Sequence, residues 1–167
     1  MRAAITREPR LLKDVSDQDL QEEFDLAMRV RDKSSQANEA VLLVRGIKAQ
    51  IDDRKKKLDA KSAAVAKALD DFAAALSAIE GEIYQVKLQS SQDPLNFPIK
   101  LNNKIAALQG IVEAGDYKPT DQSFEVFKDL STQLDKQLQR LDGIIKDDLA
   151  TFNQQLAKKR VEPVVVK

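Results

Sequence analysis

VAKALDDFAAALSAIEGEIYQV (residues 65–86) has the most regular hydrophobic pattern in the chain. Its apolar residues recur at steps of four and three: Val65, Leu69, Phe72, Leu76, Ile79, Ile83 and Val86. Steps of this size place all of these side chains on one face of an α-helix. The pattern therefore predicts a helix whose apolar face packs against other helices, and it favours a core position over a cofactor site.

The same seven-residue spacing extends back along the chain through Leu58, Ile51 and Val44. A single helix over residues 17–89 would be about 110 Å long, and no later segment is long enough to cover it. The second apolar position of each seven-residue repeat, four residues after Val44, Ile51 and Leu58, is instead polar: Lys48, Lys55 and Ser62. We therefore predict a hairpin turn at residues 57–62 (KLDAKS), with Asp59 or Ser62 as the next N-cap, and a continuous helix is the alternative.

A first long helix is predicted before this turn. Ser16 suits its N-cap, and acidic residues follow where the helix dipole favours anions: Asp17, Asp19, Glu22 and Glu23. The helix is expected to end at the basic residues 54–57 (RKKK), which suit its negative C-terminal end. This run is also the strongest candidate for nucleic-acid binding, but the balanced charge around it favours a solvated helix end.

The segment SSQDPLNFPIKLNNKIAAL (residues 90–108) differs from the helical sequence around it. Asp93-Pro94 predicts a turn, and Phe97 is unsuited to a helix because it precedes a proline. Pro98 fits the first position of a short third helix. The apolar face expected for this helix is Leu101, Ile105, Leu108 and Val112, and Gly115 is expected to end it as the C′ residue.

Two pairs of hypotheses concern the side chains of this segment. Leu95 and Phe97 are expected to plug the end of the bundle, so that Phe97→Ala would cost on the order of 2 kcal/mol; the rival is that Phe97 is an exposed contact residue. Asparagines in and after the loop either form a small polar site or, as favoured here, cap the backbone. The candidate structural or contact residues are therefore Asp93, Pro94, Leu95, Asn96, Phe97, Pro98, Asn102 and Asn103.

The last helix is predicted to begin with Thr120 as N-cap and to end at the basic residues 158–160 (KKR). Its main apolar stripe is Phe127, Leu134, Leu138, Leu141, Ile145, Phe152 and Leu156, flanked by Phe124, Leu130 and Leu149. The tail VEPVVVK, residues 161–167, is expected to be extended. Four glycines lie inside predicted helices, either on the surface or where helices approach closely: Gly46, Gly81, Gly110 and Gly143.

Composition excludes several classes of function. Basic and acidic residues number 27 each, so no strong global field favours nucleic acid or anionic lipid. The chain contains neither Cys nor His, which excludes disulfides, thiolate metal sites, a Cys nucleophile and Ser-His-Asp triads. Six Phe, two Tyr and no Trp argue against stacking platforms. The start MRAAITREPR lacks the apolar region of a signal peptide, and no apolar run approaches the roughly 18 residues of a membrane span.

Paired carboxylates are the remaining raw material for catalysis. Three doublets occur in predicted helices: Asp52-Asp53, Asp70-Asp71 and Asp147-Asp148. Neighbouring residues on a helix diverge by about 100°, so the members of a doublet cannot converge on one metal ion or one bond. We therefore expect these residues to lie on solvated helix faces, and we expect no catalytic residue, metal or cofactor in this chain.

The segment SSQDPLNFPIKLNNKIAALQGIVEAGDYKPTDQSFEVFKDLSTQLDKQL (residues 90–138), followed by DLATFNQQL (148–156), resembles the C-terminal helical region of a family of large bacterial proteins. Those proteins carry sortilin-like or bacterial-neuraminidase-repeat β-propellers and are often labelled glycosyl hydrolases. TREPR (6–10) and DLQEEFDLAM (19–28) are similar to the stretch where that family leaves its last β-module and enters the helices. The resemblance covers roughly residues 6–160.

The resemblance implies a secreted parent protein, in the periplasm or outside the cell, whose propeller would hold any glycan or peptide site. No catalytic residue of that family carries over to this chain. The partners that it implies are the parent's own propeller, another protein or a second copy in a homodimer. Nucleic acid and membrane are not expected.

Together these observations predict an all-α, antiparallel, up-and-down bundle of four helices, three long and one short. Residues 1–15 are expected to be an extended lead-in from a preceding module, 16–160 the bundle and 161–167 a tail. The expected function is non-catalytic: interdomain packing, self-association or partner binding. The alternative is an accessory domain that completes the parent's glycan or peptide cleft with residues 96–103. A lipid-binding amphipathic bundle is a third reading, which the zero net charge disfavours.

Overall fold

The protein, described as a computed structural model over residues 15–88, 90 and 92–166, is an all-α bundle. Its α-helices are α1 (Asp17–Lys56), α2 (Ala63–Ile83), α3 (Leu101–Val112) and α4 (Asp121–Lys158). Two short 3₁₀ helices lie in the connections, η1 (Ala60–Ser62) and η2 (Asp93–Leu95). The prediction of three long helices and one short helix is confirmed. Residues 1–14 of the predicted lead-in lie outside the described part of the chain.

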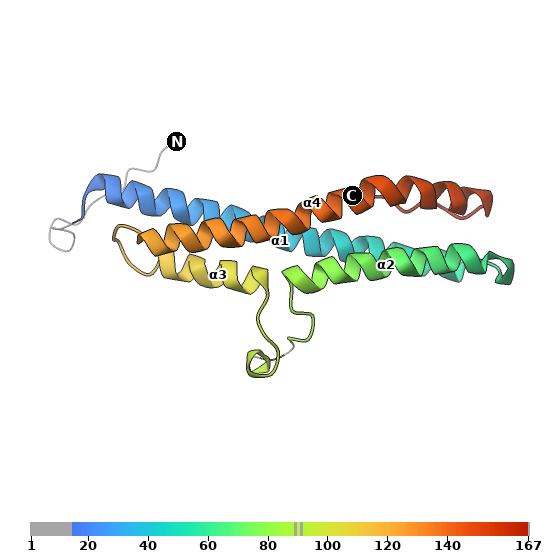
Figure 1. The fold of residues 1–167 in the computed structure, drawn as a ribbon, viewed down its shortest axis with the longest axis horizontal. Helices are drawn as coiled ribbons and strands as arrows, with labels where there is room; N and C mark the ends of the chain where they lie inside the picture. Colours follow the sequence, from blue (N-terminus) through green and yellow to red (C-terminus); the bar gives the residue numbers. More distant parts are fainter. Residues whose placement is uncertain (1–14, 89, 91, 167) are drawn as a thin grey trace.

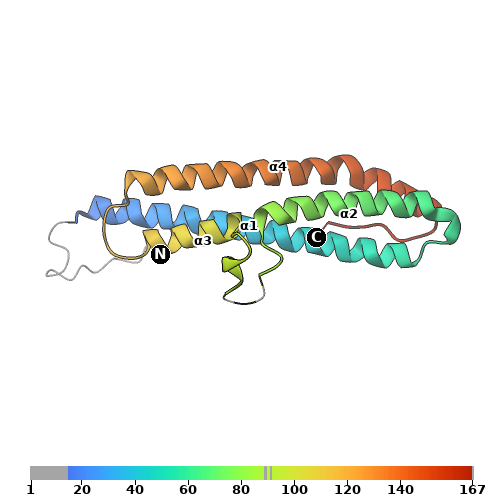
Figure 2. The same ribbon diagram turned by 60° about the horizontal axis from the view of Figure 1, so that its bottom comes forward.

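The four helices occupy three positions side by side (Figures 1 and 2). α1 and α4 run along the whole length of the bundle in the same direction, and α2 and α3 follow one another in the opposite direction. α2 packs on both long helices in one half of the bundle and α3 packs on them in the other half. The bundle is therefore antiparallel, because α1 and α4 oppose α2 and α3. The expected up-and-down alternation of all four helices is wrong, since the chain does not reverse between α2 and α3, which together form a single interrupted layer.

Both long helices begin at the N-caps that the sequence predicts. The Ser16 hydroxyl accepts a hydrogen bond from the Asp19 amide (3.1 Å), and the Asp19 carboxylate accepts one from the Ser16 amide (3.0 Å), a complete capping box. Thr120 caps α4 by accepting a hydrogen bond from the Ser123 amide at 3.2 Å. These bonds satisfy amides that have no partner within the helix.

The predicted hairpin at residues 57–62 is confirmed, which excludes one continuous helix. Asp59 directly precedes η1 and Ser62 directly precedes α2, but neither side chain caps a helix amide. Instead the Ser62 hydroxyl donates to the Asp59 carboxylate, and the Ser62 amide donates to the Asp59 carbonyl at 3.0 Å. The turn thus satisfies its own polar groups while reversing the chain.

The seam predicted from residues 65–86 forms the core face of α2, except at its last step. Its buried members are Leu69, Phe72, Leu76, Ile79 and Ile83. Val86 is 52% exposed, because α2 ends at Ile83 and the next residue, Tyr84, has extended backbone. The inclusion of Val86 in the seam was therefore wrong.

Three polar residues occupy the second apolar position of the seven-residue repeat, and each of them has a partner. Lys48 forms a salt bridge with Glu80 at 3.1 Å, Lys55 pairs with Asp70, and Ser62 bonds to Asp59 as described above. The two lysine pairs join α1 to α2 across the hairpin. The lapses in the apolar pattern are therefore places where polar pairs replace apolar contacts.

The tail folds back onto the bundle. Arg160 has left-handed backbone (φ 57°), the Val161 amide donates to the Leu156 carbonyl at 3.0 Å, and the Arg160 amide donates to the Ala157 carbonyl at 3.0 Å. These bonds form a Schellman motif with an arginine at the position usually taken by glycine. The chain is thereby turned back along α1 and α4 (Figure 1), with Val164 only 1% exposed.

Two of the basic residues at the end of α1, Arg54 and Lys57, hold this tail. The interpretation as a solvated helix end is wrong for Arg54, whereas Lys56 and Lys57 are exposed. The Arg54 guanidinium donates to the carbonyls of Glu162 and Pro163, both at 3.2 Å. Lys57 forms salt bridges with Asp53 (3.0 Å) and Glu162 (3.4 Å).

Over the described residues, no helix combines the length and apolar character needed to cross a membrane.

Arg160→Gly is expected to stabilise the protein by about 1 kcal/mol, because glycine adopts a left-handed backbone without steric cost. Thermal or urea unfolding measures the change. Lys159→Gly is the matched control, since Lys159 has an ordinary φ of −97°. The control is expected to lose stability. A destabilised Arg160→Gly variant would contradict the described tail geometry.

Candidate functional site: the loop between α2 and α3

The connection between α2 and α3 leaves the bundle at mid-length and returns to the same place (Figures 1 and 2). It comprises residues 84–100, and we refer to it as the projecting loop. At seventeen residues it exceeds the roughly 12–15 residues above which an irregular connection is usually functional or disordered. The loop lies at mid-length because α3 continues in the direction of α2 instead of reversing at the end of the bundle.

The neck of the projecting loop is closed by contacts between its two ends. The buried Gln85 donates through Nε2 to the Pro98 carbonyl at 2.9 Å. Lys100 lies 3.8 Å from the Glu82 carboxylate, which joins the start of α3 to the end of α2. A loop with its ends held together in this way resembles an Ω-loop, a frequent carrier of function.

Asp93 organises the tip of the loop. Its carboxylate accepts hydrogen bonds from the Ser90 amide (2.6 Å) and the Ser90 hydroxyl (2.9 Å). Its carbonyl accepts from the amides of Asn96 (2.9 Å) and Phe97 (2.8 Å). The turn predicted at Asp93-Pro94 is confirmed as η2.

The structure overturns the hypothesis that Leu95 and Phe97 plug the bundle end. Leu95 is 87% exposed, and Phe97 is half-buried beneath Lys87, whose Nζ lies 5.3 Å from the ring centroid. The reason is topological, because a loop that leaves at mid-length has no bundle end to cover.

The predicted ends of α3 also need correction. Pro98 is not its first residue, because α3 begins at Leu101 with Lys100 in the N-cap position. The Pro98 carbonyl is instead part of the loop neck. At the other end, α3 stops at Val112, and Gly115 lacks the left-handed φ expected of a C′ glycine. The predicted apolar face of α3 is confirmed: Leu101, Ile105, Leu108 and Val112 are buried.

The asparagines are divided between the loop and the helix. Asn96 is exposed in the loop, whereas Asn102 and Asn103 lie in the first turn of α3. The Oδ1 atoms of Asn102 and Asn103 are buried without a hydrogen-bond partner, and α3 has no side-chain cap. The favoured capping role is therefore wrong for these two residues.

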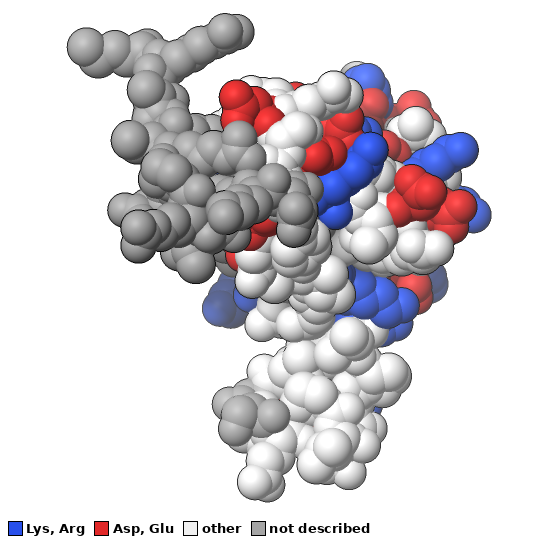
Figure 3. Space-filling view, turned by 90° about the vertical axis from the view of Figure 1, so that its left-hand side faces the viewer, with Lys and Arg blue, Asp and Glu red and all other residues white. Residues whose placement is uncertain are grey.

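The surface of the projecting loop differs from that of the bundle. Figure 3 shows basic and acidic side chains interspersed over the bundle, while the facing side of the lower lobe, which is the loop, is uncharged. Three exposed apolar residues belong to this loop: Val86, Leu95 and Ile99. The lobe therefore presents apolar side chains on a hydrogen-bonded frame, which suits contact with another surface.

A buried ion cluster at the base of the loop was missed by the sequence analysis. Glu80 is 4% exposed, and its carboxylate accepts hydrogen bonds from Arg45 Nε (2.6 Å) and Lys48 Nζ (3.1 Å). The Arg45 guanidinium also lies over the ring of Tyr84, 4.9 Å from its centroid. The feature of the sequence that pointed to this cluster was Lys48, a lysine at a position of the repeat where an apolar residue is expected.

Two cations are needed because Glu80 lies in an unfavourable place. It belongs to the last turn of α2, where the helix dipole disfavours an anion. Burial alone raises the pKa of Glu80, but the hydrogen bonds from Arg45 and Lys48 outweigh burial and hold that pKa below its ordinary value. The carboxylate is therefore charged at neutral pH and ties α2 to α1.

Several of the doublet carboxylates pair with cations. Asp53 pairs with Lys57, and the neighbours Asp70 and Asp71 meet different cations, Lys55 and Lys67. In the described part of the chain, His, Cys, Asp and Glu side chains form no group of three or more that could hold a metal ion.

Comparison with models of known protein families, with curated proteins and with solved structures gives no match to this chain. The resemblance to propeller proteins drawn from residues 6–160 therefore stays a hypothesis.

Glu80→Gln is expected to destabilise the protein by about 1–3 kcal/mol at neutral pH, because two charge-assisted hydrogen bonds weaken. Because the pKa of Glu80 is lower in the folded state than in the unfolded state, its charge stabilises the folded protein fully at pH values above the ordinary pKa of 4.5. This contribution is lost as the pH falls through the folded pKa. The difference between wild type and variant should therefore shrink on acidification, as measured by urea unfolding at a series of pH values.

Glu82→Gln is the matched control for this experiment. The Glu82 side chain is 57% exposed, so its removal should change the unfolding free energy by less than about 0.5 kcal/mol. A Glu80→Gln effect that is equally small, or that does not change with pH, would contradict the role assigned to the cluster.

Leu95→Ser should leave the free energy of unfolding within about 0.5 kcal/mol of wild type, because Leu95 is exposed. Phe97→Ala should cost more, about 1–2 kcal/mol, because its ring is half-buried. Paired thermal melts compare the two variants. A larger loss for Leu95→Ser than for Phe97→Ala would show that the tip of the loop is packed differently.

Proposed function

We propose that this chain is a non-catalytic helical module that makes protein contacts through the projecting loop. One observation supports the proposal: the loop holds Val86, Leu95 and Ile99 in exposed positions on a frame tied by Asp93 and Gln85. Exposed apolar groups gain by burial against a partner. A loop that is already ordered loses less conformational entropy when it binds.

The resemblance supports a more specific form of the proposal. In this form the chain is the C-terminal module of a larger secreted propeller protein, periplasmic or extracellular. Its contact partner is the parent's propeller, another protein or a second copy of the chain.

The alternative is that the module completes the parent's glycan or peptide cleft. The exposed amide of Asn96, next to Phe97 in the same loop, favours this alternative because a sugar is bound by hydrogen bonds and apolar stacking. In that case the isolated chain should bind sugars or peptides through the loop.

The proposal is tested first on the gene and then on the protein. The reading frame upstream of this chain should encode a β-propeller. The separately expressed propeller should then bind the chain in calorimetry, and Leu95→Asp should weaken that binding by about tenfold or more. Ile111→Asp is the control, because Ile111 is 58% exposed but lies on α3, outside the loop.

One result would overturn the specific form of the proposal, and another would overturn the protein contact itself. An upstream frame without a propeller removes the specific form. Saturable glycan binding to the chain alone, lost in Leu95→Asp, favours the cleft alternative over a protein contact.

A further inference from the structure

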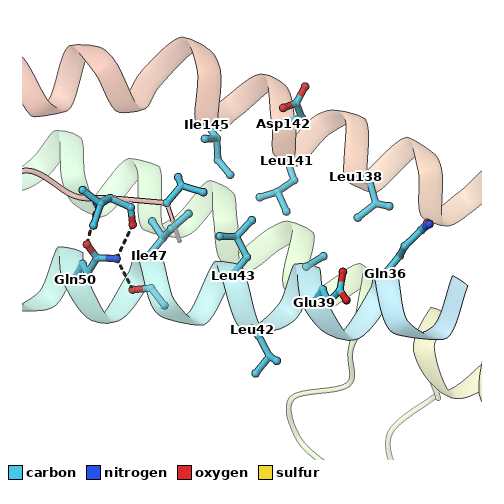
Figure 4. Close-up of a pocket in the computed structure, with 14 residues that line it drawn as sticks. Gln36, Glu39, Leu42, Leu43, Ile47, Gln50, Leu138, Leu141, Asp142 and Ile145 are labelled. Carbon is cyan, nitrogen blue, oxygen red and sulfur yellow. Dashed lines mark hydrogen bonds between the residues drawn. The ribbon is translucent and has the colours of Figure 1, made fainter. Parts of the chain in front are cut away.

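A groove of about 790 Å³ runs between α1 and α4 (Figure 4). Leu43 and Ile47 point into it from α1, and they are faced from α4 by apolar side chains: Leu138, Leu141 and Ile145. α2 and α3 do not line this groove. It is therefore separate from the projecting loop and its function.

One end of the groove is already occupied by the chain's own tail. Val165 and Val166 line the groove at that end, and just before them Val161 and Val164 are buried against the bundle. The structure thus contains an example of what this surface binds, which is an extended, valine-rich segment.

Two amide side chains hold the backbone of this segment. Asn153 of α4 donates to the Val164 carbonyl (2.9 Å) and accepts from the Val164 amide (2.8 Å). Gln50 of α1 does the same for Val165, at 2.8 Å and 2.9 Å (Figure 4). Four backbone groups are therefore satisfied by two side chains, and these contacts are independent of the sequence of the segment.

The apolar side chains of the tail give the specificity. Val161 and Val164 are buried, whereas the two residues after each of them are exposed. A period of three is that of a polyproline II helix, whose backbone amides and carbonyls are free to bond to a partner. The seated tail therefore places two apolar side chains, one step of three apart, against the surface between α1 and α4.

The open part of the groove has a defined length and charge. It extends along α1 from Gly46 to Gln36, ten residues or about 15 Å, and the Lys33–Asp135 salt bridge (2.5 Å) joins α1 to α4 beyond Gln36. An extended segment of about four or five residues covers this distance. Asp142 among the lining residues is already paired with Lys146 at 2.6 Å, so the acidic residue that favours a basic residue in the segment is Glu39.

We propose that the open part of this groove binds an extended segment of a partner protein, with an apolar residue at every third position and a basic residue near it. The segment lies in line with the tail and is held in the same manner. The continuity of the groove with the seated tail supports an extended segment over a helix.

The probe is a fluorescently labelled peptide with the tail's own sequence, VEPVVVK, added to the full chain. Fluorescence anisotropy should show saturable binding. Backbone amide shifts in NMR spectra of the wild type should change mainly around residues 36–47 and 138–145. A peptide with Asp in place of its first and fourth residues should bind about tenfold more weakly or worse.

Gly46→Phe is the blocking variant, because Gly46 lines the groove and a Cβ added there meets no atom within 4 Å. It should weaken peptide binding by about tenfold or more. Gly110→Phe is the matched control, since a Cβ at Gly110 is equally free and α3 does not line the groove. The control should bind like wild type.

Three outcomes would overturn the proposal. The first is the absence of saturable binding and of shift changes in the wild type. The second is equal binding by Gly46→Phe and Gly110→Phe. The third is a dimer of the unliganded wild type in sedimentation that Gly46→Phe dissociates, because the groove would then belong to a second copy of the chain.

Discussion

The burial of α1 is the constraint on which the rest of the structure depends. At forty residues α1 is about 60 Å long, and its buried side chains extend from Leu26 to Ile51. Full burial of one aliphatic side chain stabilises a protein by about 1.5–3 kcal/mol, so exposing half of the eight buried residues would cost an amount comparable with a typical total stability of about 5–15 kcal/mol. α4 covers one side of α1, and the other side requires α2 and α3 together.

The interrupted layer explains the features that set this bundle apart. Because α3 continues in the direction of α2, the connection between them has to leave and return at mid-length, which produces the projecting loop. The end of α2 lies inside the bundle rather than at its tip, so Glu80 is buried there and needs Arg45 and Lys48. Two long parallel helices also leave a groove between them, which the tail fills over part of its length.

Polar groups do much of the positioning in this all-helical fold. Gln50, Arg54 and Asn153 hold the tail by its backbone, and Gln85 closes the neck of the projecting loop. Each of these bonds joins segments that are distant in the sequence or separated by irregular chain. The apolar stripes specify a bundle, and the amide and guanidinium side chains specify where its irregular segments lie.

The sequence by itself determined the elements that depend on short-range physics. Ser16 and Thr120 satisfy helix amides three residues away, and the apolar period shows which face of each helix is buried, so the starts of α1 and α4, the core faces and the hairpin were predictable. The projecting loop was recognised as irregular from its prolines, but the exposure of Leu95 was not. Only the tertiary structure decided that exposure, the partners of Glu80 and the docking of the tail on Arg54. An apolar period specifies the buried face of a helix but not its neighbour, and these three features depend on which helices become neighbours.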